Sequence, residues 1–133
     1  MITDKTKDLL TEYLQKIIAG GTLTTNFSAS ATVNAGSGKI GQGGNSTSPA
    51  ATTLDVPLST ATSTFAAVKS DTNVIEVQAI FQGATSSMTG KVIREFGIFD
   101  SSSNLLARVN FDGIGPFSST EDLELFLAIE VEW

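Results

Sequence analysis

The 133-residue sequence contains no cysteine and no histidine. Without cysteine there are no disulfides, catalytic thiolates or cysteine-ligated zinc sites. Without histidine there are none of the Ser-His, Cys-His and His-metal arrangements that carry much of hydrolytic catalysis. Paired carboxylates can hydrolyse glycosides without histidine, but nothing in the sequence selects such a pair. We therefore expect no catalytic residues, no cofactor and no metal, and a protein that is not an enzyme.

Positive charge is scarce, because 8 Lys and Arg stand against 14 Asp and Glu, for a net charge of −6. Binding to nucleic-acid phosphates needs clustered basic residues, and here they are scattered, so we expect no nucleic-acid partner. No segment approaches the roughly 18 to 20 apolar residues that span a bilayer. The N-terminus also lacks the apolar segment and cleavage site of a secretory signal, so we expect no membrane partner and synthesis in a cytoplasm.

One amphipathic helix is expected over residues 3–19. Its apolar side chains recur three and four residues apart, which forms one stripe along a helix. They are Leu9, Leu10, Tyr13, Leu14, Ile17 and Ile18. Thr3 or Asp4 can cap the start, and Gly20-Gly21 can end the helix. A helix of this length is marginal alone in water, so its stripe must bury against this chain or another subunit.

The rest of the chain has the period of β-strands. β-Branched residues at 22–33 and Phe65 with Val68 favour strands, and Gly/Ser-rich residues at about 34–50 favour a surface loop around a short strand at 39–42. Clear alternation or apolar runs predict strands at 74–82, 92–99, 105–111 and 122–133. We therefore expect a mainly β fold, an antiparallel sandwich or barrel-like sheet preceded by one helix. Residues 1–21 form the helix and its Gly-Gly joint, and residues 22–133 form a single β domain.

Three motifs that could carry chemistry do not fit their context. Residues 36–41 read G-x-G-x-x-G, but the following Gln-Gly-Gly-Asn cannot begin the helix that a dinucleotide site requires. Asp100, Ser102 and Asn104 have the first spacings of a calcium loop, yet the later Gly and Glu are missing, so a hairpin turn is the better account. Residues 121–124 hold the densest acidic cluster, for which a solvated loop is favoured over a weak divalent site.

The sequence VIREFGIFD at 92–100, a Ser-rich turn and LLARVNF at 105–111 resemble a pattern of tailed-bacteriophage structural proteins. These are the tail fibre, collar and baseplate-associated proteins. The resemblance covers about residues 39–133, and its most specific part is residues 93–100. The motif residues are Ile93, Arg94, Glu95, Phe96, Gly97, Ile98, Phe99 and Asp100. Adjacent strand residues project to opposite faces, so Arg94 and Glu95 are each expected to pair with another strand.

The resemblance implies a virion structural protein that acts by self-assembly and docking to other virion proteins, as a symmetric homo-oligomer. Receptor-binding shafts or tips often follow this domain in the family, whereas this chain stops at Trp133, which favours a connector, collar or decoration piece. One alternative is a capsid decoration protein. Another is a carbohydrate-binding adhesion module, for which Trp133, Tyr13 and Phe117 are the available aromatic residues.

Two features are candidates for an assembly interface. Most phenylalanines are expected in the core, but Phe126 falls on the Glu-rich face of the last strand, where alternation predicts solvent. The helix stripe either packs on its own sheet or docks on a neighbouring subunit, and we expect assembly to be its main role. The candidate interface residues are Leu10, Tyr13, Leu14, Ile17, Ile18 and Phe126.

Overall fold

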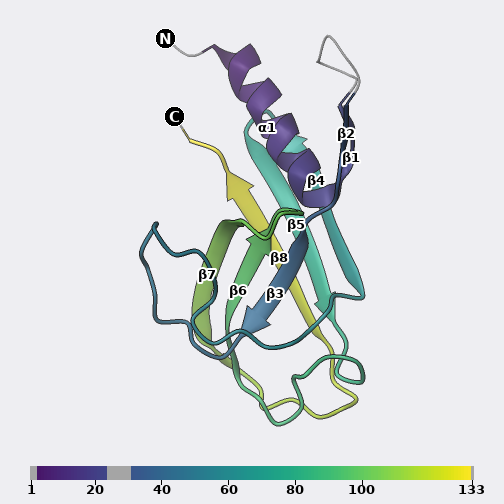
Figure 1. Ribbon diagram of the computed structural model, residues 1–133, viewed down its shortest axis with the longest axis vertical. Coiled ribbons are helices and arrows are strands. Elements are labelled where there is room, and N and C mark those ends of the chain that lie inside the picture. The colour runs from purple at the N-terminus through teal and green to yellow at the C-terminus, as the bar shows by residue number, and fades with distance from the viewer. Residues whose placement is uncertain (1–2, 24–30, 133) are drawn as a thin grey trace.

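The computed structural model describes residues 3–23 and 31–132. In this part of the chain one helix and eight strands follow one another, and their arrangement is drawn in Figure 1. They are α1 (Asp4–Ala19), β1 (Gly21–Leu23), β2 (Ala31–Val33), β3 (Ser37–Gly41), β4 (Thr64–Asp71), β5 (Val74–Phe81), β6 (Ile93–Phe99), β7 (Leu105–Ile114) and β8 (Leu123–Glu130).

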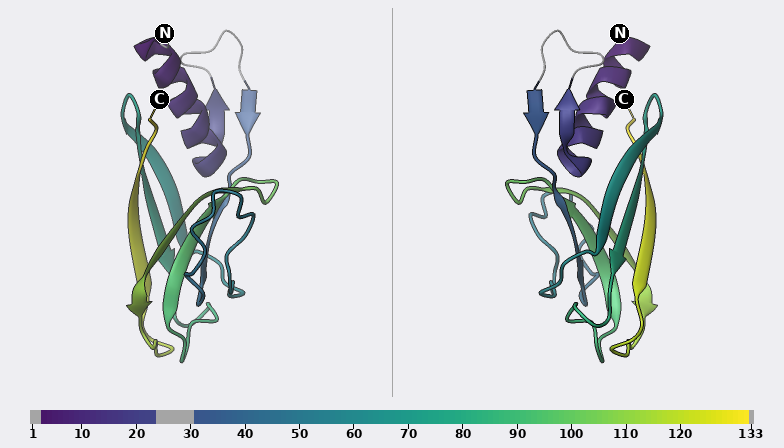
Figure 2. Two further views of the ribbon diagram at one scale, coloured as in Figure 1. Left: turned by 90° about the vertical axis from the view of Figure 1, so that its left-hand side faces the viewer. Right: turned by 90° about the vertical axis from the view of Figure 1, so that its right-hand side faces the viewer.

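Two three-stranded antiparallel sheets, in the orders β3-β6-β7 and β4-β5-β8, form the body of the molecule. The two sheets lie face to face, and β1 and β2 form a separate hairpin beside the helix (Figure 2). The expectation of a mainly β, sandwich-like fold with one N-terminal helix is confirmed. The sheets remain separate, so the barrel-like alternative does not apply.

The core lies between the sheets and follows the predicted alternation. On β5, Ile75, Val77, Ala79 and Phe81 are buried. Phe81 meets Phe96 of the other sheet edge to face, with ring centroids 6.2 Å apart. The turn-rich connection after β5 also contributes a core residue, because Met88 is fully buried. The two sheets therefore share one continuous apolar core.

The helix begins and ends as its sequence predicts. The Thr3 hydroxyl accepts a hydrogen bond from the Thr6 N–H, and Gly20, at φ 79°, donates its N–H to the Lys16 carbonyl. α1 lies over the inner face of the β4-β5-β8 sheet, beyond the end of the second sheet (Figure 2). The Gln15 side chain donates to the Ala67 carbonyl of β4 at 2.7 Å, and Ile18 is fully buried in the core. The helix therefore packs on its own chain.

Two local expectations need correction. Residues 22–33 do not form one strand, because β1 and β2 pair as the arms of a hairpin, and residues 24–30 lie outside the described part. The short strand expected at 39–42 begins earlier, at Ser37, because the backbone of Ser37 and Gly38 pairs with Phe99 and Ile98. The long irregular segment consequently starts after Gly41 and runs to β4.

Candidate docking site

Residues 93–99 of the sequence motif form β6, the central strand of its sheet, and Asp100 follows it. Ile93, Phe96, Ile98 and Phe99 are buried, so most of the motif serves the core. Gly97 is closely packed, because an added Cβ atom would lie 2.9 Å from the Leu54 side chain and would require that side chain to shift. Packing in the central strand of a sheet therefore accounts for most of these residues.

Glu95 is a fully buried carboxylate in this strand. Its oxygens accept hydrogen bonds from four backbone N–H groups of the segment between β3 and β4. These belong to Gly43, Gly44 at 3.1 Å, Asp55 at 2.6 Å and Val56 at 3.0 Å. Arg108 of β7 stands 3.4 Å from the same carboxylate, which confirms the expected cross-strand pairing of Glu95. Arg94 has no ion-pair partner among the residues described.

Asp55 extends this network to the same loop. Its carboxylate accepts from the Asn45 and Ser46 N–H groups at 2.7 and 2.8 Å, and Arg108 lies 3.3 Å away. The backbone donors of Ser46 and Asn45, followed by Arg108, hold the pKa of Asp55 below its ordinary value. Asn110 of β7 donates to the Ser46 carbonyl. Together these contacts fasten residues 43–56 to β6 and β7.

The chemistry of this cluster is structural. The Glu95 side chain is buried, and both its oxygens accept backbone hydrogen bonds. A general acid or base must lie within hydrogen-bonding reach of a substrate. The Glu95 carboxylate instead uses both oxygens to bind the backbone of the loop, so its role is to organise that loop. The alternation of the strand did not predict that Glu95 is buried, although a Glu between apolar residues on both sides of the Arg94-Glu95 pair is a signal that points to it.

The other motifs also have structural explanations. Asp100 accepts from the Ser102 and Asn104 N–H groups, which makes the hairpin turn that was favoured over a calcium loop. The Asn104 hydrogen bonds are the main cause of the lowered pKa of Asp100. Residues 36–41 contain β3, so no helix follows for a dinucleotide.

The acidic residues at 121–124 are engaged separately. Glu121 accepts from the Ser118 N–H, Asp122 from the Gly83 N–H and Glu124 from the Gln78 side chain. Across residues 3–23 and 31–132, no three acidic side chains come together as metal ligands. Glu121 and Asp122 therefore stabilise the turn before β8, and Glu124 links β8 to β5.

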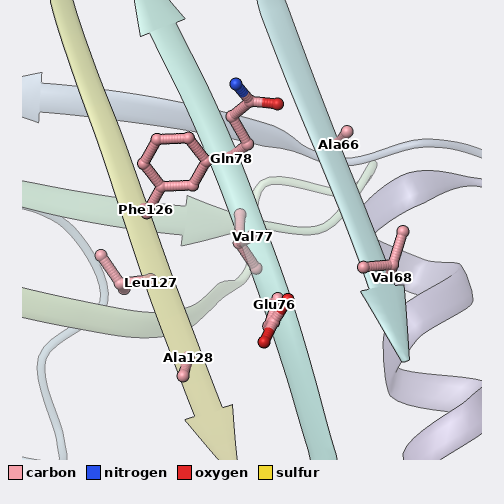
Figure 3. A pocket seen from close by; sticks show the side chains of 8 residues that line it. All are labelled: Ala66, Val68, Glu76, Val77, Gln78, Phe126, Leu127 and Ala128. Carbon is pink, nitrogen blue, oxygen red and sulfur yellow. The ribbon is translucent and has the colours of Figure 1, made fainter. Parts of the chain in front are cut away.

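The outer face of the β4-β5-β8 sheet presents apolar side chains to solvent (Figure 3). The register places Ala66, Gln78 and Phe126 in one row across the sheet, and Val68, Glu76 and Ala128 in the next. These six residues are called the Phe126 face. Phe126 is 71% exposed, and its ring lies beside Gln78 above a shallow hollow of about 490 Å³. Alternation correctly predicted that Phe126 faces outward.

The Phe126 face carries negative charge alone. Glu76 lies within it, and Glu124 and Glu130 stand at outward positions toward the two ends of β8. Lys69 of β4 points to the opposite side of the sheet, where its Nζ pairs with Asp8 of α1. This ion pair lowers the pKa of Asp8. The outward positions of the three strands therefore combine exposed apolar groups with carboxylates.

The helix residues of the candidate interface divide into two groups. Ile18 is buried, and Leu14 packs against the core, so both belong to the fold of this chain. Ile17 is half-buried. Leu10 and Tyr13 are 45% and 47% exposed. The structure thus separates Phe126 from the helix, because α1 covers the inner face of the sheet and Phe126 lies on the outer one.

The described part of the chain contains no helix long and apolar enough to cross a membrane. Comparison of the chain with protein-family models, with curated proteins and with solved structures finds no match.

Proposed function

We propose that this protein is a structural component of a tailed-phage particle, in the tail, collar or baseplate region. It acts by docking to other virion proteins and to further copies of itself. The observation that carries the proposal is the Phe126 face, where an exposed phenylalanine lies with Ala66, Val68 and Ala128 on the outer side of a paired sheet. Exposed apolar surface of this kind marks sites of protein–protein contact.

The build of the molecule supports a docking role. Two sheets share one core, and the buried Glu95 holds the long loop against β6 and β7. Such a block presents its outer faces in a fixed geometry, which lowers the ordering cost when it joins an assembly. The resemblance at residues 93–111 to tail fibre, collar and baseplate-associated proteins supports the same role.

The test is to find the protein in particles. Antibodies raised against the purified chain are used to follow it through density-gradient fractions of a lysate that contains tailed particles. We expect it to sediment with intact particles and, by immunogold electron microscopy, to lie at the tail, collar or baseplate. Label on the capsid shell would support the decoration alternative. Absence from washed particles would contradict the proposal.

The carbohydrate-binding alternative has less support. Of the three aromatic residues considered for a sugar platform, Phe117 is buried and Trp133 lies outside the described residues. Tyr13 is exposed on α1, away from the Phe126 face. A sugar platform needs an exposed aromatic ring, so burial of Phe117 removes one of the three.

A further inference from the structure

We propose that copies of this chain associate head to tail, with the exposed side of α1 of one copy seated on the Phe126 face of the next. This inference deepens the proposed assembly function and names the partner of the Phe126 face as a second copy of the same chain. It rests on two exposed apolar surfaces that point in different directions and carry opposite charge.

The first surface is the outward side of α1, here called the α1 face, with Leu10 and Tyr13 at its centre. Asp8 and Gln15 contact β4, whereas Leu10 and Tyr13 project elsewhere and are nearly half exposed. By helical periodicity, the charged residues that border Leu10 and Tyr13 are Lys7 and Lys16. Neither has a carboxylate partner in the described ranges. The helix's acidic residues, Asp4, Asp8 and Glu12, fall on its other sides.

The second surface has the complementary charge. Glu76, Glu124 and Glu130 occupy outward positions on β5 and β8. Two copies that packed through the Phe126 face alone would place these carboxylates against their equivalents, which is unfavourable. The lysine-bordered α1 face avoids this repulsion and covers Phe126 with Leu10 and Tyr13. Charge therefore favours an unlike pair of surfaces over a symmetric dimer.

The two surfaces also match in size. A helix of 16 residues is about 24 Å long, and strands of eight residues are about 26 Å long. Three strands with a spacing of about 4.8 Å span about 10 Å, which is the width of one helix. One helix therefore covers the Phe126 face.

The footprint predicts a weak individual contact. An area of about 24 by 10 Å is smaller than the roughly 800 Å² per partner of a standard stable interface. Contacts between unlike surfaces repeat from copy to copy and produce a ring or a filament. Many weak contacts of one kind become strong when a ring closes or when copies are held together on a particle.

The experiment measures mass against concentration by sedimentation equilibrium, from micromolar to millimolar protein. The wild-type mass should rise above the 13.9 kDa of the monomer, and added salt should reduce association. Phe126→Asp removes one surface and Leu10→Glu the other, so each variant alone should weaken association by about tenfold or more. Phe126→Asp keeps the α1 face, and Leu10→Glu keeps the Phe126 face. A mixture of the two variants should therefore form one intact contact and give a 1:1 pair that does not grow further.

Matched variants make each result decisive. Ile114→Asp places a charge on an exposed apolar residue outside both surfaces and should associate like wild type. Circular dichroism confirms that each variant is folded, and Tyr13→Glu and Val68→Asp replace any variant that is not. A wild-type chain that stays at 13.9 kDa up to millimolar concentration would overturn the inference. So would a Leu10→Glu variant that still associates, because that result indicates a symmetric contact.

The outcome is separate from the test of function. If the chain is monomeric in solution but sediments with particles, head-to-tail association is excluded and the proposed function is still supported. A chain that associates in solution but is absent from particles would remove the proposed function and leave the contact.

Discussion

At the scale of single residues, Glu95 illustrates how a buried charge is stabilised. Removing a carboxylate from water is costly unless hydrogen bonds and an opposite charge replace the lost hydration. Four backbone N–H groups and Arg108 do so here. The four N–H groups come from a loop with little apolar content, so Glu95 orders a segment that the hydrophobic effect alone would hold weakly.

Replacing Glu95 should therefore destabilise the protein strongly. Glu95→Ala leaves the loop donors and Arg108 without their acceptor, and we expect a loss of about 3–5 kcal/mol in the free energy of unfolding. Glu95→Gln keeps one acceptor oxygen and should cost about 1–3 kcal/mol. Urea denaturation measures the losses. Amide exchange should show faster exchange at Gly44, Asp55 and Val56.

The control for Glu95 is Glu76→Gln, which changes an exposed carboxylate on the Phe126 face. It should alter stability by no more than about 0.5 kcal/mol. Unchanged exchange of the loop amides in Glu95→Ala would contradict the assignment of Glu95 as the residue that orders the loop.

At the scale of secondary-structure elements, the joint between α1 and the sandwich depends on one close backbone contact. The Gly36 N–H donates to the Ile18 carbonyl at 3.0 Å, just before β3 begins. An added Cβ atom at Gly36 would lie 2.0 Å from the Phe99 carbonyl oxygen. The end of the helix, the start of β3 and the end of β6 thus meet where a side chain does not fit.

Gly36→Ala should separate these elements slightly and lower the free energy of unfolding by about 1–3 kcal/mol. The cause is steric, because the Phe99 carbonyl belongs to the paired backbone of β6 and cannot rotate away. Thermal and urea denaturation measure the effect, and Asn34→Ala, an exposed position nearby, should change stability by no more than about 0.5 kcal/mol. A fully stable Gly36→Ala protein would show that the contact is not constrained.

At the scale of the whole molecule, three carboxylates join separate parts of the fold. Asp8 links α1 to β4, Asp55 links the long loop to β7, and Asp100 closes the hairpin between β6 and β7. The pKa of each is lowered from 3.8, by Lys69, by the loop N–H groups and by Asn104 respectively. The folded state therefore favours their ionised forms.

Stability should consequently fall in acid. A carboxyl with a lower pKa in the folded state contributes stability above its ordinary pKa and loses it as the pH falls through the folded value. We expect a level melting temperature at neutral pH and a decline below about pH 4. Asp55→Asn and Asp100→Asn should each make the decline shallower than in the wild type. A decline as steep as the wild type's in both variants would contradict this explanation.

The net charge of −6 leads to a further expectation for the whole protein. Calcium should not raise the melting temperature, because no clustered carboxylate ligands are present in the described chain. DNA should not be shifted in a gel at physiological salt, because the basic residues are dispersed and the protein is acidic. A clear calcium-dependent rise in melting temperature, or a retarded DNA band, would contradict the respective expectation.

Local patterns were sufficient for most of the fold. The three-and-four spacing located α1, and the alternation from Ile75 to Phe81 and from Leu123 to Ile129 located β5 and β8 and their buried faces. The outward position of Phe126 followed from the same period. These properties depend on residues within one strand or one helical turn. Such residues are close together in the sequence, so their pattern can be read from it.

Other properties depended on contacts between segments far apart in the chain. The buried side of α1 depends on its contacts with β4. Gln15 and Asp8 bind residues of β4, whereas Leu10 and Tyr13 remain exposed to solvent. The burial of Glu95 required the loop at residues 43–56 to fold over β6. The Phe126 face exists only because register brings three strands together. Hydrophobic periodicity identifies the apolar face of each helix or strand. Which segment buries that face depends on packing across the whole molecule.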